Sequence, residues 1–279
     1  MGELIPIKDV SIAAALTDES GMTVGTERKA RPCTVCEVMQ EPRVIPELNM
    51  VIHRPPICEA CMKNAEEAER MEAEAFRRKN AEKELMLCGV PPEFVKYSFI
   101  TGRNGTINWT GKTKDAVQVC VQYAMKPEGA ILLMGKTGRG KTHVAIAIMR
   151  DVVIKGGKAR FVSCLDLMNS LRAVYRARND DDEDSSEQEV LSRIGRGLVV
   201  LDDLGATRVT PMVRDSLTLI VDRCERRGQP LVVTTNLTIP EIGEKFDERL
   251  ASRLVGLCKS PERVITLEGI DHRLPKAKR

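Results

Sequence analysis

The sequence predicts an α/β core with a parallel sheet of five strands, preceded by a small metal-binding segment and a long helix. Three observations predict this arrangement. Short apolar runs alternate with segments of helical periodicity from residue 109 onward. The first of these runs leads into a glycine-rich loop at residues 135–142, and two Cys-x-x-Cys pairs lie near the N-terminus. A buried strand that runs into such a loop and out into a helix is typical of open α/β sheets.

The chain has 279 residues, which is enough for one α/β core and an accessory module. We expect a flexible N-terminal arm over residues 1–30 and a compact cysteine-containing module over residues 31–62. A helical linker over residues 63–88 then leads to the core domain, residues 89–279.

Composition and charge narrow the class of protein. Charged residues make up 30% of the chain and aromatic residues 3%, which favours a helix-rich protein with an aliphatic core. The net charge of +3 is too small to indicate nucleic-acid binding by itself. No apolar stretch reaches the length of a membrane span, and the N-terminus lacks the pattern of a signal peptide. We therefore expect a cytoplasmic protein with no membrane partner.

Four of the nine cysteines form two closely spaced pairs, Cys33 with Cys36 and Cys58 with Cys61. In a reducing cytosol such thiols bind metal or stay free, and two tight turns complete the tetrahedral thiolate shell that Zn²⁺ prefers. His53 is the alternative ligand. We rank the four cysteines first because both pairs share one spacing, whereas His53 stands alone. A segment this short cannot bury a sufficient core, so we expect it to unfold without zinc.

Residues 62–87 consist almost entirely of strong helix formers and predict one long charged helix that ends before Gly89. Such a helix can be a rigid spacer, a surface for a partner, or a solvated connection between two domains. The sequence leaves these alternatives open.

The glycine-rich loop follows the apolar run Ala130–Met134 and precedes a helix-like segment, so its N–H groups and the helix dipole point at one anion. Lys141 can reach the β- and γ-phosphates of a nucleotide, and the Thr142 hydroxyl can hold Mg²⁺. The alternative is a chance glycine-rich turn. We therefore predict a nucleoside triphosphate site formed by Gly135, Lys136, Thr137, Gly138, Arg139, Gly140, Lys141 and Thr142.

Polar side chains end two later apolar runs. Asp202 and Asp203 follow the buried run that begins at Leu198, and Asn236 follows residues 230–235. Ligands of open α/β sheets bind at the carboxyl ends of the strands, so we expect these side chains beside the loop. Asp202 is the candidate magnesium ligand, and Asp203 would orient or deprotonate the attacking water. Asn236 is the candidate sensor of the γ-phosphate. The alternative for the two acids is that they cap a helix.

The loop, the Asp-Asp strand and the Thr-Thr-Asn strand, in this order, resemble the AAA+ ATPases of the bacterial and phage helicase-loader group. This is the DnaC and DnaI family, with its transposition relative IstB. The resemblance covers residues 89–273. Five segments within this range also match the family, namely Gly89–Phe94, Tyr97–Phe99, Leu198–Gly205, Asp247–Leu254 and Leu267–Arg273. The first two look like the family's segment near the adenine.

The resemblance also implies roles for several arginines. Arg253 looks like the family's arginine finger, supplied in trans to a neighbouring subunit, with Arg249 as second choice; either can instead make a surface salt bridge. A finger in trans implies self-association in a ring or spiral. Single-stranded DNA contact is implied for the helix at residues 166–178, through Arg172, Tyr175, Arg176 and Arg178. An amphipathic surface helix with routine cations is the alternative for that segment.

The expected function is an ATP-dependent loader that binds a hexameric replicative helicase through its N-terminal region and places it on single-stranded DNA. Its cofactors would be ATP, Mg²⁺ and Zn²⁺, and hydrolysis would be slow and stimulated by single strands. One alternative is an IstB-like transposition helper that clamps target DNA. Another is a nucleotide-switched adaptor with negligible turnover, because Asp203 stands where the family commonly has a glutamate.

Overall fold

The computed structural model describes residues 23–25, 30–45, 50–53, 57–102, 105–106, 109, 111–177, 192, 194–206, 208–268 and 271. The chain divides into two compact units, Met1–Ala73 and Glu74–Arg279.

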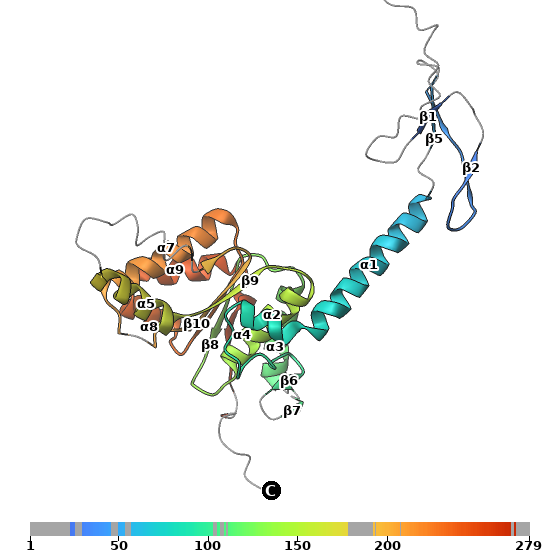
Figure 1. Cartoon of the computed structure of the whole chain (residues 1–279). Coiled ribbons are helices and arrows are strands. Elements are labelled where there is room, and N and C mark those ends of the chain that lie inside the picture. Colours follow the sequence, from blue (N-terminus) through green and yellow to red (C-terminus); the bar gives the residue numbers. More distant parts are fainter. Residues whose placement is uncertain are drawn as a thin grey trace, which may run out of the picture. The chain divides into compact units, whose positions relative to one another are not determined.

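The larger unit is built on a parallel sheet of five strands (Figure 1). In space the strands follow the order β12, β8, β11, β10 and β9, and each neighbouring pair is parallel. This confirms the prediction of a five-stranded parallel sheet. The bounds of the strands are β8 Ala130–Met134, β9 Ala159–Ser163, β10 Leu198–Leu204, β11 Leu231–Thr235 and β12 Val264–Thr266.

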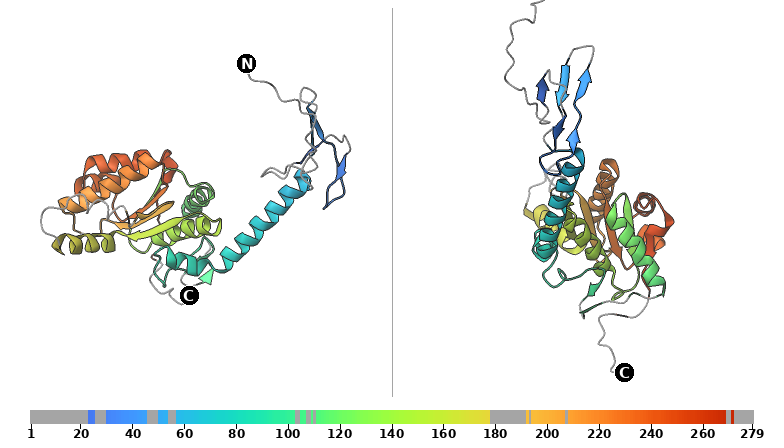
Figure 2. Two further views of the ribbon diagram at one scale, coloured as in Figure 1. Left: turned by 45° about the horizontal axis from the view of Figure 1, so that its top comes forward. Right: turned by 90° about the vertical axis from the view of Figure 1, so that its right-hand side faces the viewer.

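Helices cover both faces of this sheet (Figures 1 and 2). Along β8, Leu132 belongs to one buried apolar cluster, whereas Ile131 and Leu133 belong to the other. Successive side chains of a strand point to opposite faces, so a strand that is covered on both sides is apolar throughout. One cluster is completed by α5 Cys164–Ala177, α7 Pro211–Arg227, α8 Ile239–Lys245 and α9 Glu248–Leu257. The other is completed by α2 Ala81–Leu87, α3 Gly111–Met125 and α4 Lys141–Ile154.

Helix α4 begins at Lys141, directly after the glycine-rich loop. Gly140 precedes it with φ 88°, a left-handed conformation that glycine adopts without strain. Most residues of α4 are buried, because the helix lies between the sheet and helices α2 and α3. The order of strand, loop and helix thus places the loop at the carboxyl end of β8.

Three short elements complete the described part of this unit. Strands β6 Thr101–Gly102 and β7 Gly105–Thr106 form an antiparallel hairpin. The 3-10 helix η2, Pro261–Arg263, leads into β12.

The smaller unit contains two small antiparallel sheets. One has the strand order β1 Thr23–Gly25, β5 Met50–His53 and β4 Arg43–Ile45, and the other pairs β2 Arg31–Pro32 with β3 Met39–Gln40. Within residues 1–30, where we expect a flexible arm, residues 23–25 form β1 and pair with β5. Residues 1–22 and 26–29 of that arm lie outside the described residues.

Two helices occupy the segment for which the sequence predicts one (Figure 1). Helix α1 spans Glu59–Lys79 and α2 begins at Ala81. The interruption falls at Asn80, whose side-chain Nδ2 donates to the carbonyl of Phe76 at 2.9 Å. Asparagine competes in this way with the regular helical hydrogen bonds of the backbone. The end of α1 is attached to the core, because Arg77 Nε donates to the carbonyl of Ile154 at 2.8 Å.

Among the described residues, no helix combines the length and the apolar character that crossing a membrane requires.

Candidate nucleotide site and metal centre

Lys141 lies at the start of α4 with its ammonium group folded over the loop. Its Nζ donates to the carbonyls of Gly135 at 2.8 Å and Lys136 at 3.1 Å, and to Asn236 Oδ1 at 2.5 Å. Only 7% of the residue is exposed. Neutral oxygens are weaker partners of a buried ammonium group than the oxygens of a phosphate. The side chain is therefore placed to exchange them for a nucleotide's phosphates.

Two glycines of the loop stand where a side chain would collide with the C-terminal part of the chain. A Cβ at Gly135 would meet the carbonyl oxygen of Leu267, and one at Gly138 would meet the carboxylate of Asp271. Both glycines also have positive φ, 131° and 80°. These two glycines thus allow the loop to pack closely against the C-terminal part of the chain.

Asp202 faces the loop from the carboxyl end of β10. Its Oδ1 accepts from Thr142 Oγ1 at 2.9 Å and from Thr234 Oγ1 at 2.7 Å. Burial raises the pKa of the Asp202 carboxyl, while the hydrogen bonds from the two threonines oppose that rise. Two adjacent ligands in an octahedral magnesium shell, each about 2.1 Å from the ion, lie about 3 Å apart. The oxygens of Thr142 and Asp202 fit that spacing.

Asp203 lies next to Asn236 at the same edge of the sheet. Asn236 Nδ2 donates to Asp203 Oδ1 at 3.1 Å, while its Oδ1 accepts from Lys141. The amide of Asn236 therefore connects the lysine of the loop to the second acid of β10. The structure brings together all five of the side chains that the sequence singled out here, namely Lys141, Thr142, Asp202, Asp203 and Asn236.

Sequence reasoning missed Thr234 as a member of this group. The apolar run that contains Thr234 and Thr235 predicts only a buried strand, although two polar residues at its end are a usable signal. Both threonines are almost completely buried. A buried hydroxyl requires a hydrogen-bond partner, and that of Thr234 is the Asp202 carboxylate.

An aromatic cluster lies beside the first turn of α4. His143 stacks on Tyr97, with ring centroids 4.4 Å apart and an interplanar angle of 16°. Trp109 meets His143 edge-on at 5.8 Å, and His143 Nε2 is 2.7 Å from the Ser98 carbonyl oxygen. These contacts join residues 97–98, part of the segment predicted to lie near the adenine, to the helix that carries Lys141. No signal in the sequence singles out His143.

The two candidate finger residues differ in their surroundings. Arg253 forms an ion pair with Asp222 of α7, and its side chain is 26% exposed. Arg249 is exposed, and within the part of the chain that the structure describes its guanidinium makes no hydrogen bond or ion pair. Both lie on α9, which begins after the N-cap Asp247. Their action in trans stays a prediction.

The candidate DNA-binding residues lie on or just after α5. Arg172 donates to the carbonyl of Arg208 at 3.3 Å. Tyr175 and Arg176 belong to the helix, but their side chains lie outside what the structure describes, as does Arg178 as a whole. Their role also stays a prediction.

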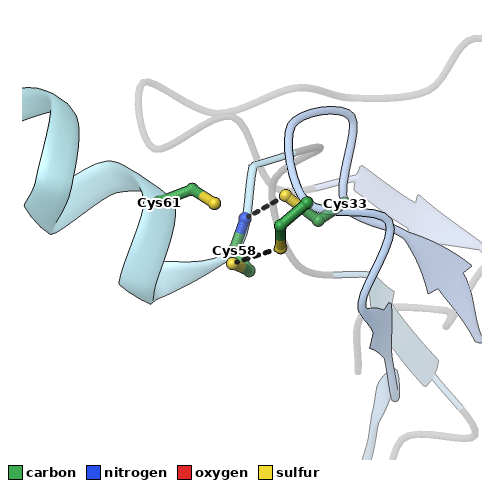
Figure 3. Close-up of side chains that lie close together, drawn as sticks. Cys33, Cys58 and Cys61 are labelled. Atoms are coloured by element: carbon green, nitrogen blue, oxygen red, sulfur yellow. Dashed lines mark hydrogen bonds between the residues drawn. The ribbon is translucent and has the colours of Figure 1, made fainter.

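The four paired cysteines come together in the smaller unit. Cys33 lies at the hairpin β2–β3, Cys58 just before α1 and Cys61 in its first turn (Figure 3). The sulfur atoms of the four cysteines all lie within 4.8 Å of one another, and those of Cys36 and Cys58 are 3.5 Å apart. Four thiolates about 2.3 Å from a Zn²⁺ ion are about 3.8 Å apart, so the cluster fits zinc.

Hydrogen bonds from the backbone lower the pKa of one of these thiols, and hydrogen bonds among the cysteines raise the pKa of another. Cys33 Sγ accepts the N–H of Cys58 at 3.2 Å and of Val35 at 3.4 Å. Such hydrogen bonds, that from Cys58 foremost, lower the pKa of Cys33 to about 6. Hydrogen bonding of Cys61 with Cys36 and Cys58 raises its pKa to about 12. Sulfur atoms this close together cannot all carry a negative charge without a cation between them. The site is therefore suited to a dication that neutralises the thiolates.

Known proteins resemble parts of this chain. The replicative helicase loader DnaC of Escherichia coli K12 is 25% identical over 144 residues, which are 50% of this chain and 57% of that protein. A putative ATP-binding protein of insertion sequence IS5376 from Geobacillus stearothermophilus is 28% identical over 145 residues, 52% of this chain and 55% of that protein. The chain thus spans little more than half the length of these relatives.

The fold has relatives among solved structures. The crystal structure of DnaI matches with a TM-score of 0.50 at 17% identity, over 66% of this chain and 94% of that one. The model of the IstB-like ATP binding proteins matches residues 118–276, more than half of the chain, and includes the loop, both acids, Asn236 and α9. The chain therefore belongs to the family of IstB-like ATP-binding proteins, with an AAA+ fold.

Proposed function

We propose that this protein is an ATP-dependent loader of a replicative DNA helicase. In this proposal its N-terminal region binds a hexameric helicase, and its AAA+ core couples the nucleotide state to placement of that helicase on single-stranded DNA. The observation that carries the enzymatic part is the contact of Lys141, Asp203 and Asn236 at the mouth of the loop. The helicase as partner rests on the similarity to DnaC. Under this proposal the protein works in the cytoplasm.

The residues at the loop suit hydrolysis of MgATP. Lys141 and the loop amides would hold the phosphates, and Thr142 and Asp202 would hold Mg²⁺, which neutralises the charge that develops during phosphoryl transfer. Asp203 would orient the attacking water, and Asn236 would sense the γ-phosphate. Asp203 is one methylene shorter than the glutamate common at this position, which favours slow turnover. We expect single-stranded DNA to stimulate it.

Self-association would complete the site. Arg253 of one copy, supported by Arg249, would reach the γ-phosphate bound by its neighbour in a ring or spiral that ATP assembles. A guanidinium placed there stabilises the transferring phosphoryl group. The ion pair with Asp222 then holds Arg253 within its own subunit until a neighbour docks.

A pull-down against a hexameric replicative helicase tests the role of the N-terminal region. The truncated chain should begin at Glu74 rather than at Gly89, because α2 contributes Leu85, fully buried, to the core and Arg77 anchors α1. We expect the full chain to capture the helicase and residues 74–279 to lose capture while they still bind ATP. Equal capture by both would place the docking surface in the core and contradict the assignment.

A transposition helper is the second candidate, because the family model and the relative from Geobacillus stearothermophilus both favour it. In that case the protein would clamp double-stranded target DNA. The cysteine cluster argues against it, since we expect transposition helpers to carry a helical N-terminal domain. The two functions separate in a binding assay. A loader prefers single-stranded DNA in the presence of helicase, whereas a helper binds duplex DNA with ATP alone.

A further inference from the structure

Thr234 lies between the two acids of β10, although it belongs to the neighbouring strand β11. Its hydroxyl donates to Asp202 Oδ1 at 2.7 Å and accepts the backbone N–H of Asp203 at 2.8 Å. The residue is 1% exposed, so water does not compete for either bond. One hydroxyl thus contacts both of the acids that the proposed reaction uses.

The backbone of β10 departs from regular pairing at this point. Leu201 is opposite Val233, and Leu204 is opposite Thr235, so Asp202 and Asp203 together face Thr234. This is a β-bulge, in which an extra residue bends the strand and redirects its side chains. Asp203 has φ 59°, which is unusual for a residue with a side chain. The hydroxyl of Thr234 supplies the acceptor that the disrupted ladder no longer offers to Asp203 N–H.

The direction of the two hydrogen bonds follows from the groups involved. An ionised carboxylate only accepts, so the Thr234 proton lies toward Asp202. A lone pair of the same oxygen then receives the N–H of Asp203. The bond to Asp202 does not depend on Thr142, whose hydroxyl is the group expected to turn toward Mg²⁺. Thr234 can therefore hold Asp202 in place whether or not Thr142 contacts it.

We propose that Thr234 is a positioning residue of the nucleotide site, which orients Asp202 toward the magnesium position and holds the bulge that directs Asp203 toward Asn236. This inference rests on the proposed use of MgATP. It adds to that proposal a residue that touches neither nucleotide nor metal. Groups in this position typically change metal affinity or activity by about 10- to 100-fold when they are removed.

Thr235 provides a matched control. It is equally buried and its hydroxyl also makes two bonds, donating to the Leu204 carbonyl at 2.7 Å and accepting from Leu237 N–H at 3.1 Å. It contacts neither acid through these bonds. Replacing either threonine by valine keeps the shape of the side chain and removes one buried hydroxyl. The two changes should therefore destabilise the fold by similar amounts. Only the change at Thr234 should alter the dependence of hydrolysis on Mg²⁺.

The experiment compares Thr234→Val, Thr234→Ser and Thr235→Val with the unmodified chain. We expect Thr234→Val to raise the Mg²⁺ concentration for half-maximal hydrolysis about tenfold and to lower kcat about 10- to 100-fold. Binding of a fluorescent ATP analogue in excess EDTA should not change. Thr234→Ser should restore both values to within about threefold, and Thr235→Val should leave the Mg²⁺ dependence unchanged at a similar thermal midpoint.

Two results would overturn the proposal. One is that Thr234→Val and Thr235→Val change kcat and Mg²⁺ dependence equally, which would indicate general loss of packing. The other is that serine fails to rescue while its thermal midpoint equals that of the unmodified chain. Failure of the proposed function is recognised separately, because the unmodified chain would then bind no nucleotide. If that chain binds nucleotide without turnover, the Mg²⁺ dependence of analogue binding tests Thr234 alone.

Discussion

The cysteine-containing unit and the α/β unit are stabilised by different means. In the α/β unit, two large apolar clusters lie on the two faces of the sheet. In the smaller unit, Cys33 and Val51 are the only buried apolar residues among those whose side chains the structure describes. Val35, Val38 and Met39 are more than half exposed there. A metal ion is therefore the principal source of stability open to the smaller unit.

Zinc removal should have the largest effect and should separate the two units. A structural zinc site contributes about 10 to 16 kcal/mol of apparent binding free energy in small domains, which is more than such a segment gains from its apolar contacts. We expect a chelator, or the Cys33→Ser change, to unfold the smaller unit and to leave the thermal transition of the core in place. Limited proteolysis and zinc analysis, expected to give about one ion per chain, would measure this.

Cys88→Ser is the control for that change, because Cys88 lies outside the cluster and is only partly buried. Its zinc content should equal that of the unmodified chain. A Cys33→Ser protein that keeps all its zinc would rule out the ligand set of four cysteines, and His53 would become the alternative.

Changing Lys141 should affect the core alone. Lys141→Ala removes the ammonium group that would contact the transferred phosphate, and we expect hydrolysis to fall by at least about 100-fold. Zinc content should not change, because the two sites lie in different units. Lys155→Ala, at the other end of α4, should hydrolyse ATP at the unmodified rate. Full hydrolysis by Lys141→Ala would remove the loop from the proposed mechanism.

Arg253 and Asp222 allow a test of action in trans, because either change breaks the same ion pair. Arg253→Ala should lower hydrolysis by at least about 100-fold, whereas Asp222→Ala should lower it by less than about threefold. A mixture of Arg253→Ala with Lys141→Ala should regain activity, since some sites then combine an intact loop with an intact arginine. Equal loss in Arg253→Ala and Asp222→Ala would show that the ion pair only supports the fold. Arg249→Ala would then be the remaining finger candidate.

The core was largely predictable because its signals are local. Each strand of a covered parallel sheet is apolar throughout, and the glycine-rich loop is identified by its own eight residues. The bulge at Asp203 was not predictable, since it depends on a hydrogen bond to a hydroxyl of another strand. The ion pair of Arg253 joins two helices that are distant in the sequence. The break between α1 and α2 could have been predicted, because Asn80 is a local signal within a run of helix formers.

The smallest predicted effect concerns the first turn of α8, in the core. Thr238 and Glu241 form a capping box, in which Thr238 accepts the N–H of Glu241 and Glu241 accepts that of Thr238 at 2.7 Å. Thr238→Ala should lower the free energy of unfolding by about 1 kcal/mol.

The same capping box predicts a dependence of stability on pH. The hydrogen bond from the Thr238 backbone lowers the pKa of Glu241. The stabilisation by the Glu241 carboxylate is therefore complete above the pKa of the unfolded chain and is lost as the pH falls through the pKa of the folded chain. Denaturant titration at pH 7 and near pH 3 measures this. The difference between the unmodified chain and Glu241→Gln should shrink at the lower pH, and a difference that stays constant would show that the carboxylate does not contribute. Such a graded loss contrasts with the complete unfolding expected of the smaller unit, because the core rests on many independent contacts and the smaller unit on one ion.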